Sequence, residues 1–507
     1  MTNDQRASGI LLHPTSLPGK YGIGTLGKAA TDFVDFLAGS KQQYWQILPL
    51  GPTGFADSPY QCYSAHAGNP NLIDFDELVN EGLLSKEDTQ NFPFFDEGPV
   101  DFDRVQKARK PLLVKAYQAF KESRDPTARL KFRNFLKNNS FWLHDYALFM
   151  AIKAHMDMKP WYHWDAAIKQ RKPEVVTHFQ HLLKEDIEYY KFIQYLFFRQ
   201  WFAIKEYAHK KSIRIIGDIP LYISLDSADA WINTHLFEFD NKLNPVRVGG
   251  VPPDYYSETG QLWGNPLFRW KEEQEEVTRW WEQRIQTNLT LFDLIRIDHF
   301  RGFAAYWAVP FGEKTAVKGK WIDGPGKDFF DAMIKRFGSL PIIAEDLGVI
   351  TPDVEELRDH FGFPGMKVLE FAFDSEEAND YLPYNYTRNC IVYTGTHDND
   401  TVQGWFEEAS EEDRDYLLAF VNTAGDQIHW DMIRLAWSSV ANLAIVPMQD
   451  LLGLDSSARM NIPGTTVNNW QWRARQEDFT EDLSDKLREL TVLYGRGNSE
   501  PGNKIKF

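Results

Sequence analysis

Short runs of apolar, often β-branched residues recur along the chain, with longer segments of helical periodicity between them. Near-continuous apolarity is typical of strands buried on both faces, as in a parallel sheet covered by helices. Eight strand–helix units in one chain favour an α/β fold, the (β/α)8 TIM barrel. The strands are predicted at residues 9–13, 44–50, 213–220, 294–298, 342–346, 367–373, 391–398 and 442–449.

Two intervals between the predicted strands are too long for simple crossovers. We expect residues 74–205 to form a mostly helical insertion, and residues 221–293 to carry an active-site lid loop and a helix. Insertions at the C-terminal face of a barrel build the walls of its active site. Residues 1–507 are therefore predicted to form a single catalytic barrel, with too short a segment after the eighth strand for a C-terminal β domain.

Acidic residues stand at the carboxyl ends of four predicted strands: Asp218, Asp298, Glu345 and Asp398. Barrel enzymes have their active sites at this end. Residues two apart on a strand point the same way, so Arg296 shares a face with Asp298. We expect the Arg296 charge to lower the pKa of Asp298 and keep it ionised. Because buried like charges cost free energy, this set of acids indicates a catalytic site.

Such a set suits chemistry at a glycosidic bond. Two carboxyl groups about 5 Å apart permit double displacement, in which one attacks the anomeric carbon and the other protonates the leaving oxygen. Neighbouring acids raise the pKa of the proton donor. Glu345, with the longer side chain, fits the acid/base, and Asp298 fits the nucleophile. Asp398, beside His397, suits a group that binds sugar hydroxyls in the transition state.

Composition narrows the substrates and the compartment. Aromatic residues make up 15% of the chain, with 17 Trp and 21 Tyr, which suits platforms for sugar rings or a large aromatic core. The net charge of −17 argues against nucleic acid and anionic membranes as partners. Two cysteines cannot form a disulfide framework, and neither a signal peptide nor a membrane span is apparent. We expect a cytoplasmic protein, or one of the plastid stroma after removal of a transit peptide.

Eight distinctive strings lie in order along nearly the whole chain. They are LHPTSLPG (12–19), SPYQCYSAHAGNP (58–70), GDIPLYI (217–223), VGGVPPDYYSETGQLWGNP (248–266), RIDHFRG (296–302), AEDLG (344–348), GTHDND (395–400) and NIPGTTVNNW (461–470). These strings resemble those of amylomaltases, also called 4-α-glucanotransferases or disproportionating enzymes, of glycoside hydrolase family 77. No motif position departs from the family's pattern.

The resemblance implies an α-amylase-like barrel that transfers segments of α-1,4-glucans (maltooligosaccharides, amylose, starch or glycogen) without a cofactor or metal. It implies the same roles for the three catalytic acids. We expect substrate contacts from Tyr60, Asp218, Trp263, Asn265, Arg296, His299, His397 and Asn461. A lid is implied at Gly249, Gly250, Val251, Pro252, Pro253, Asp254, Tyr255 and Tyr256. We expect a monomer or a weak homodimer.

Some of these residues have a second interpretation. His13, inside an apolar run, is typical of a hydrogen-bonded core histidine. The glycines and prolines of 248–256 would also suit a rigid corner, and Asn461 a turn, although its side-chain amide equally suits sugar hydroxyls.

Three other functions remain open on the residues alone. An α-1,4-glucan hydrolase would use the same acids, and only the resemblance favours transfer over hydrolysis. A metal-dependent barrel hydrolase would use His299, His397, Asp298 and Asp398, but the first strand has the lone His13 instead of an H-x-H pair. A non-catalytic glucan-binding protein would explain the aromatic residues but not the acids at the strand ends.

Overall fold

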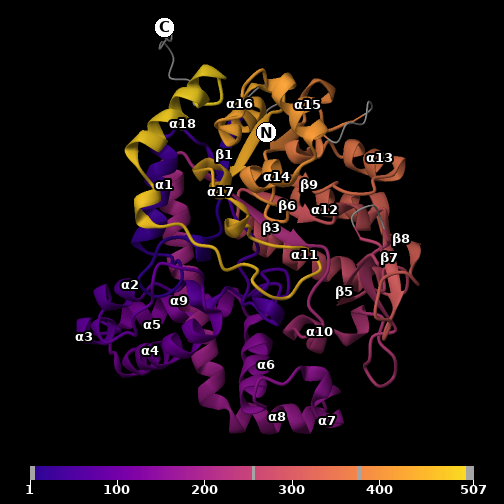
Figure 1. The fold of residues 1–507 in the computed structure, drawn as a ribbon. Helices are drawn as coiled ribbons and strands as arrows, with labels where there is room; N and C mark the ends of the chain where they lie inside the picture. The colour runs from indigo at the N-terminus through magenta and orange to yellow at the C-terminus, as the bar shows by residue number, and fades with distance from the viewer. Residues whose placement is uncertain (1–5, 254–256, 374–378, 498–507) are drawn as a thin grey trace.

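A barrel of eight parallel strands forms the centre of the molecule (Figure 1). The computed structural model describes residues 6–253, 257–373 and 379–497. In chain order the barrel strands are β1 (Ala7–Leu11), β2 (Tyr44–Gln46), β3 (Arg214–Pro220), β6 (Leu294–Asp298), β9 (Ile342–Ala344), β10 (Gly365–Val368), β11 (Cys390–Tyr393) and β12 (Leu443–Pro447). All eight predicted strands are present, and the predicted TIM-barrel fold is confirmed.

The strands follow the chain order around the barrel, and every ladder between neighbours is parallel. The ring closes between β9 and β10, where the Ala344 amide donates to the Pro364 carbonyl at 2.9 Å. The sixth strand was predicted at 367–373, but β10 ends at Val368 and a 3-10 turn, Leu369–Phe371, follows it. An apolar run does not by itself distinguish a strand from a buried turn of helix.

Helices surround the barrel: α1 (Lys28–Gly39), α9 (Lys184–Lys210), α11 (Gln274–Leu291), α12 (Gly326–Phe337), α13 (Pro352–His360), α14 (Val402–Glu408), α15 (Glu411–Val421), α16 (Ile428–Ser438), α17 (Met448–Leu452) and α18 (Glu481–Leu493). The last helix, α18, packs against α1 (Figure 1). Buried Arg496 then donates to the Ala7 carbonyl at 2.9 Å, so the last described turn is tied to the first strand.

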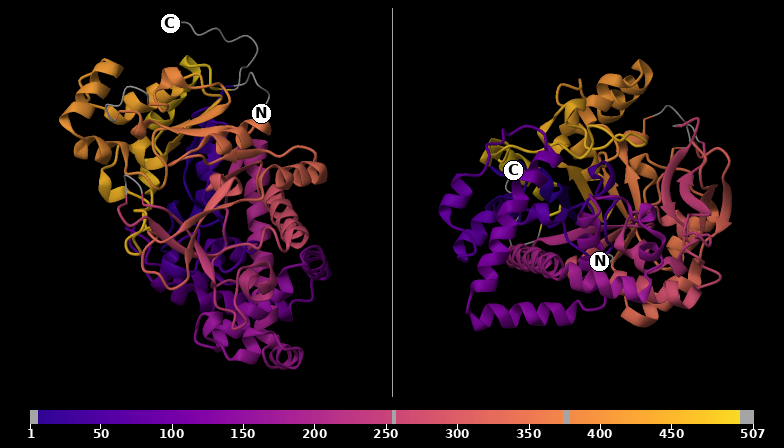
Figure 2. Two further views of the ribbon diagram at one scale, coloured as in Figure 1. Left: turned by 90° about the vertical axis from the view of Figure 1, so that its right-hand side faces the viewer. Right: turned by 90° about the horizontal axis from the view of Figure 1, so that it is seen from below.

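The first long interval is helical. It contains α2 (Phe75–Asn80), α3 (Lys86–Gln90), α4 (Phe102–Glu122), α5 (Pro126–Asn138), α6 (Leu143–His155), α7 (Ala166–Lys169) and α8 (Pro173–Leu182), and it ends in α9. These helices extend from one side of the barrel, as the indigo-to-magenta ribbon of Figures 1 and 2 shows. We propose that this interval, residues 74–205, and residues 221–293 are insertions into one barrel. Within the described part of the chain, no helix is long and apolar enough to cross a membrane.

A second, four-stranded antiparallel sheet lies beside the barrel, in the order β5-β4-β7-β8. Its strands are β4 (Arg247–Val251), β5 (Gln261–Pro266), β7 (Ala305–Pro310) and β8 (Lys320–Asp323). The sequence did not predict this sheet, because its strands come from both sides of β6 and pair only in the folded chain.

The sheet corrects part of the predicted lid loop. Gly249, Gly250 and Val251 belong to strand β4. Both glycines are required by close packing: a Cβ at Gly250 would overlap the Gln261 carbonyl, and one at Gly249 would lie 2.8 Å from the Tyr222 ring. Pro252 and Pro253 follow the strand directly. Asp254, Tyr255 and Tyr256 lie outside the described residues, so a lid at 252–256 stays a prediction.

We predict that Gly9→Ala destabilises the barrel by about 2 kcal/mol or more. A Cβ at Gly9 would overlap the Tyr44 carbonyl on β2 and lie 2.9 Å from the Ile445 side chain on β12. Thermal unfolding of the variant measures this. Gly39→Ala is the control, because its Cβ meets only the flexible end of Ser484, at 3.1 Å. Equal melting temperatures for the two variants would contradict the packing argument.

Candidate active site

The predicted acids gather at the C-terminal mouth of the barrel. Asp298 is the last residue of β6, Glu345 follows β9 directly, and Asp218 lies near the end of β3. Asp398, however, lies in the loop after β11, which was predicted to extend through residue 398 but ends at Tyr393. Within this loop, Asn399 Oδ1 accepts hydrogen bonds from the amide and the hydroxyl of Thr396, at 3.0 and 2.7 Å.

Arg296 joins the acids of two neighbouring strands. Its Nη1 donates to Asp218 Oδ2 at 2.6 Å, and its Nη2 lies 3.0 Å from Asp298 Oδ1. The Tyr60 hydroxyl donates to the same Asp218 oxygen at 2.8 Å and lies 2.8 Å from His397 Nε2. Since the hydroxyl has one proton, Nε2 of His397 is the donor in that second contact. One network therefore connects Tyr60, Asp218, Arg296, Asp298 and His397.

The electrostatics at Asp298 differ from the sequence prediction. Burial raises the pKa of Asp298, and the negative charge of Asp398 raises it further, while Arg296 and His397 lower it. The predicted net lowering is wrong because burial outweighs the Arg296 charge, which Asp298 shares with Asp218. The pKa of Arg296 itself is raised well above its ordinary value by the two aspartates, although burial lowers it, so the guanidinium stays charged.

Glu345 is held by the backbone on both of its oxygens. Oε2 accepts from the His299 amide at 2.6 Å, and Oε1 accepts from the Leu347 amide at 2.9 Å. His299 adopts left-handed backbone angles, with φ of 56°, directly after Asp298. Burial raises the pKa of Glu345 to about 8, and the Asp298 charge adds to this, against the opposing effects of Arg296 and the two amides. Glu345 is therefore protonated at neutral pH, as a general acid requires.

The Asp398 side chain is 43% exposed, unlike that of buried His397 beside it. Its Oδ1 accepts from the Asn461 side-chain amide at 2.6 Å, and its Oδ2 lies 3.5 Å from His397 Nε2. Asn461 was predicted to bind substrate, and in the structure its amide binds Asp398.

The remaining predicted contacts lie on the side of the small sheet. The Trp263 and His299 rings meet edge to face at 4.8 Å between centroids. Burial lowers the pKa of His299 to about 3, and its Nε2 has no partner among the described residues. Asn265 is buried, and its amide donates to the Ile223 carbonyl at 2.6 Å, so contact of Asn265 with substrate stays a prediction.

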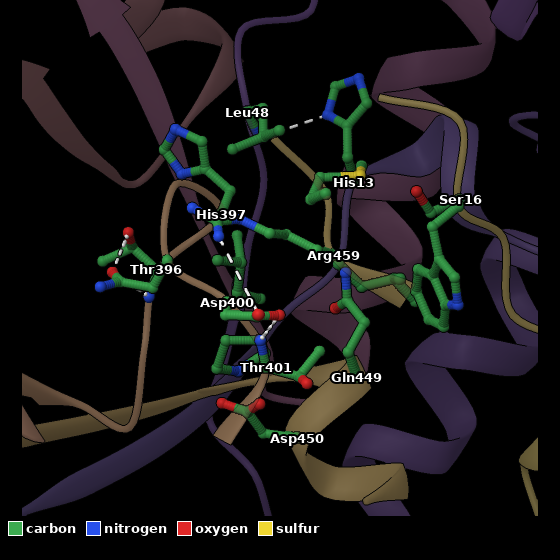
Figure 3. A pocket seen from close by; sticks show the side chains of 16 residues that line it. His13, Ser16, Leu48, Thr396, His397, Asp400, Thr401, Gln449, Asp450 and Arg459 are labelled. Carbon is green, nitrogen blue, oxygen red and sulfur yellow. Dashed lines mark hydrogen bonds and ion pairs between the residues drawn. The ribbon is translucent and has the colours of Figure 1, made fainter. Parts of the chain in front are cut away.

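A pocket of about 430 Å³, open solvent included, adjoins the loop that carries Asp398 (Figure 3). His13 lines it, and its Nδ1 accepts from the Leu48 amide at 3.2 Å. Burial lowers the pKa of His13 to about 3. The interpretation of His13 as a hydrogen-bonded core histidine is confirmed.

Sequence reasoning missed three groups around this loop. Glu370 and Asp450 are buried behind it, and Asp450 accepts from the Thr394 hydroxyl at 2.6 Å. Burial raises the pKa of Asp450 to about 6 and that of Glu370 well above its ordinary value. Arg459 donates to the Asp398 carbonyl at 2.8 Å. The only sequence signal was the position of Arg459 two residues before the NIPG string. No cluster of three or more potential metal ligands occurs among the described residues.

Comparison with known proteins identifies the family. A sequence model described as 4-alpha-glucanotransferase matches residues 12–478. The chain belongs to the 4-α-glucanotransferase family. The family's activity is transfer between glucan chains, which confirms the predicted enzyme class and does not favour the hydrolase alternative.

Relatives of this glucanotransferase family match over almost their full length. A 4-alpha-glucanotransferase of Synechocystis sp. is 50% identical over 97% of this chain and 98% of its own. One from Thermus thermophilus is 46% identical over 97% and 99%. Among solved structures, the amylomaltase from Streptococcus agalactiae in complex with acarbose is 44% identical, with a TM-score of 0.94 over 97% of this chain and all of that one.

We predict that Glu345→Gln stabilises the protein more at pH 8 than at pH 5. The folded protein retains the Glu345 proton up to a pKa of about 8, whereas the unfolded chain releases it near the ordinary value of 4.5. Wild-type stability therefore falls as pH rises between these values, and glutamine removes the loss. Melting temperatures at both pH values measure the difference. Glu477→Gln, which changes an exposed acid, is the control. If the difference in melting temperature between Glu345→Gln and the wild type were the same at both pH values, the raised pKa would be contradicted.

Proposed function

We propose that this chain transfers a segment of an α-1,4-glucan to the 4-hydroxyl of glucose or of a second glucan, by retaining double displacement. The observation that supports this proposal most is the hydrogen bond between Glu345 and the backbone amide of His299, the residue that follows Asp298. A proton donor with a raised pKa is bonded to the backbone of His299, directly beside a carboxylate that Arg296 contacts. A protonated acid next to a carboxyl group that is paired with an arginine suits a proton donor and a nucleophile.

In the first step, Glu345 protonates the glycosidic oxygen while Asp298 attacks the anomeric carbon. The C–O bond to the leaving glucan breaks as the bond to Asp298 Oδ forms, which leaves a covalent glucosyl-enzyme and a fragment with a new 4-hydroxyl. Glu345 is then ionised. Burial is the main reason that the pKa of Glu345 is raised, and esterification of Asp298 removes the charge that raised it further, so Glu345 stays ionised and is available as the base in the next step.

In the second step, Glu345 accepts the proton of an acceptor 4-hydroxyl, and that oxygen displaces Asp298 with net retention. Trp263 and His299, at the small sheet, are proposed to line the acceptor side. An acceptor sugar that occupies this side excludes water, which favours transfer over hydrolysis. A lid at 252–256 would also exclude water and favour transfer.

The other side chains of the network are proposed to bind the donor sugar. Asp218 Oδ1 is buried without a hydrogen-bond partner among the described residues, so a sugar hydroxyl would satisfy it. Asp398 and His397 border the same mouth, where hydroxyl contacts that shorten in the transition state would lower the barrier. Tyr60 stacks on His397 at 5.3 Å between ring centroids and is proposed to pack against the sugar. The acarbose complex of the Streptococcus agalactiae relative supports a glucan-like ligand.

We also propose a cytoplasmic location. Both cysteines lie within the described residues as free thiols, at Cys62 and Cys390, in keeping with a reducing compartment.

Incubation with maltotriose alone tests transfer against hydrolysis. We expect glucose together with a ladder of longer maltodextrins, since each glucosyl-enzyme is intercepted by a sugar 4-hydroxyl. Chromatography of the products over time measures the ratio of transfer to hydrolysis. Glucose and maltose without longer products would refute the proposal.

Glu345→Gln should lower kcat with maltotriose by about 10²- to 10⁴-fold, because a proton donor is lost. With α-maltosyl fluoride, whose leaving group needs no proton, formation of the covalent intermediate should survive in this variant. Asp298→Asn should be inactive with both donors. Glu477→Gln, which lies on the surface, should match the wild type. Full turnover of maltotriose by Glu345→Gln would overturn the catalytic assignment.

A further inference from the structure

The Arg459 guanidinium joins two segments of chain beside the active site. Its Nη2 donates to the backbone carbonyl of Asp398 at 2.8 Å, and its Nε donates to the carbonyl of Asn461 at 2.9 Å. The first carbonyl belongs to the loop after β11, and the second to the segment that follows α17. Two nitrogens of one planar group thus fix the distance between Asp398 and Asn461.

This spacing determines where the Asp398 carboxylate lies. The Asn461 amide, Nδ2, donates to Asp398 Oδ1 at 2.6 Å. Arg459 holds the backbone of both residues, and Asn461 holds the side chain of Asp398, so the contacts form a closed ring. Rotation of the Asp398 carboxylate would break a short hydrogen bond whose donor is fixed by the same arginine.

The third nitrogen of Arg459 faces the same loop. Its Nη1 lies 4.0 Å from Asp400 Oδ2, and Figure 3 shows the two side chains converging in the pocket. Asp400 is in turn fixed, because Oδ2 accepts from the Ser456 hydroxyl and Oδ1 accepts from the Thr401 amide, each at 2.7 Å. The guanidinium is therefore oriented by a carboxylate two residues beyond Asp398.

The rest of the loop has its own anchors. Thr396 binds Asn399, Thr394 binds buried Asp450, and Val402 donates to Asp450 at 2.8 Å. These contacts hold both ends of the loop without Arg459. Removal of the guanidinium should therefore loosen Asp398 and leave the loop folded.

We propose that Arg459 is a positioning residue that fixes the Asp398 carboxylate for the transition state. The inference rests on the proposed function, in which Asp398 binds the reacting sugar. Lysine cannot replace Arg459, because a single ammonium group lacks the planar fork that reaches both carbonyls. Asn461 has the same positioning role, because it holds the Asp398 carboxylate that would bind the sugar.

Arg459→Lys should lower kcat with maltotriose by about 10- to 100-fold, as expected when a catalytic group is displaced by about 1 Å. KM should change much less, because the Asp398 contact strengthens in the transition state. The melting temperature should stay close to that of the wild type. Arg475→Lys is the matched control, since Arg475 is exposed and pairs with Glu477 on the surface. An unchanged kcat in Arg459→Lys would overturn the proposal.

A double-mutant cycle distinguishes positioning from a general structural role. Added to Asp398→Asn, the Arg459→Lys change should cost no further rate, because the group that it positions has already lost its charge. Multiplying losses would overturn the proposal. Full activity of Asp398→Asn alone would instead refute the role of Asp398 in the proposed function. If Arg459→Lys fails to fold, Asn461→Ala replaces it in the cycle, with the same two outcomes.

Discussion

The buried Arg296 guanidinium is the interaction on which the site depends. It neutralises Asp218 on one strand and Asp298 on the next, in a place where burial raises the pKa of both. Without a cation, two carboxylates on adjacent strands would repel each other and would take up protons. Arg296 has a position near the end of β6, so the ladder between β3 and β6 brings it to Asp218. The register between β3 and β6 therefore determines which charges meet in the active site.

The roles proposed for Asp298 and Glu345 rest on what surrounds each carboxyl group. Burial raises the pKa of both groups, and Arg296 lowers the pKa of both. Asp298 also has His397 as a favourable partner and is repelled by Asp398, whereas Glu345 is repelled by Asp298 and accepts from two backbone amides. Burial, with the Asp298 charge adding to it, raises the pKa of Glu345 to about 8, so Glu345 holds a proton at neutral pH. Esterification of Asp298 in the proposed first step would remove one of the causes that raise the pKa of Glu345. The pair thus suits both steps of a transfer reaction.

Segments far apart in the chain complete the site from outside the barrel. The small sheet brings Trp263 to His299, and the segment after α17 brings Asn461 to Asp398. Gly249 and Gly250 of β4 are required by packing against Tyr222 and Gln261. These two glycines therefore serve the packing of a strand and do not indicate a flexible lid. Residues of the loop after β11 are held by buried Asp450 from behind and by Arg459 from the side.

Much of this protein was determined by its sequence. The apolar runs predicted all eight strands, because burial on both faces requires continuous apolarity, and strand alternation placed Arg296 beside Asp298. The motifs predicted the family. Tertiary structure alone decided that the pKa of Asp298 is raised and not lowered, since burial and the sharing of one arginine between two acids leave no local pattern. It also decided the end of β11, the second sheet and the contacts of Arg459, because each depends on residues distant in the chain that only folding brings together.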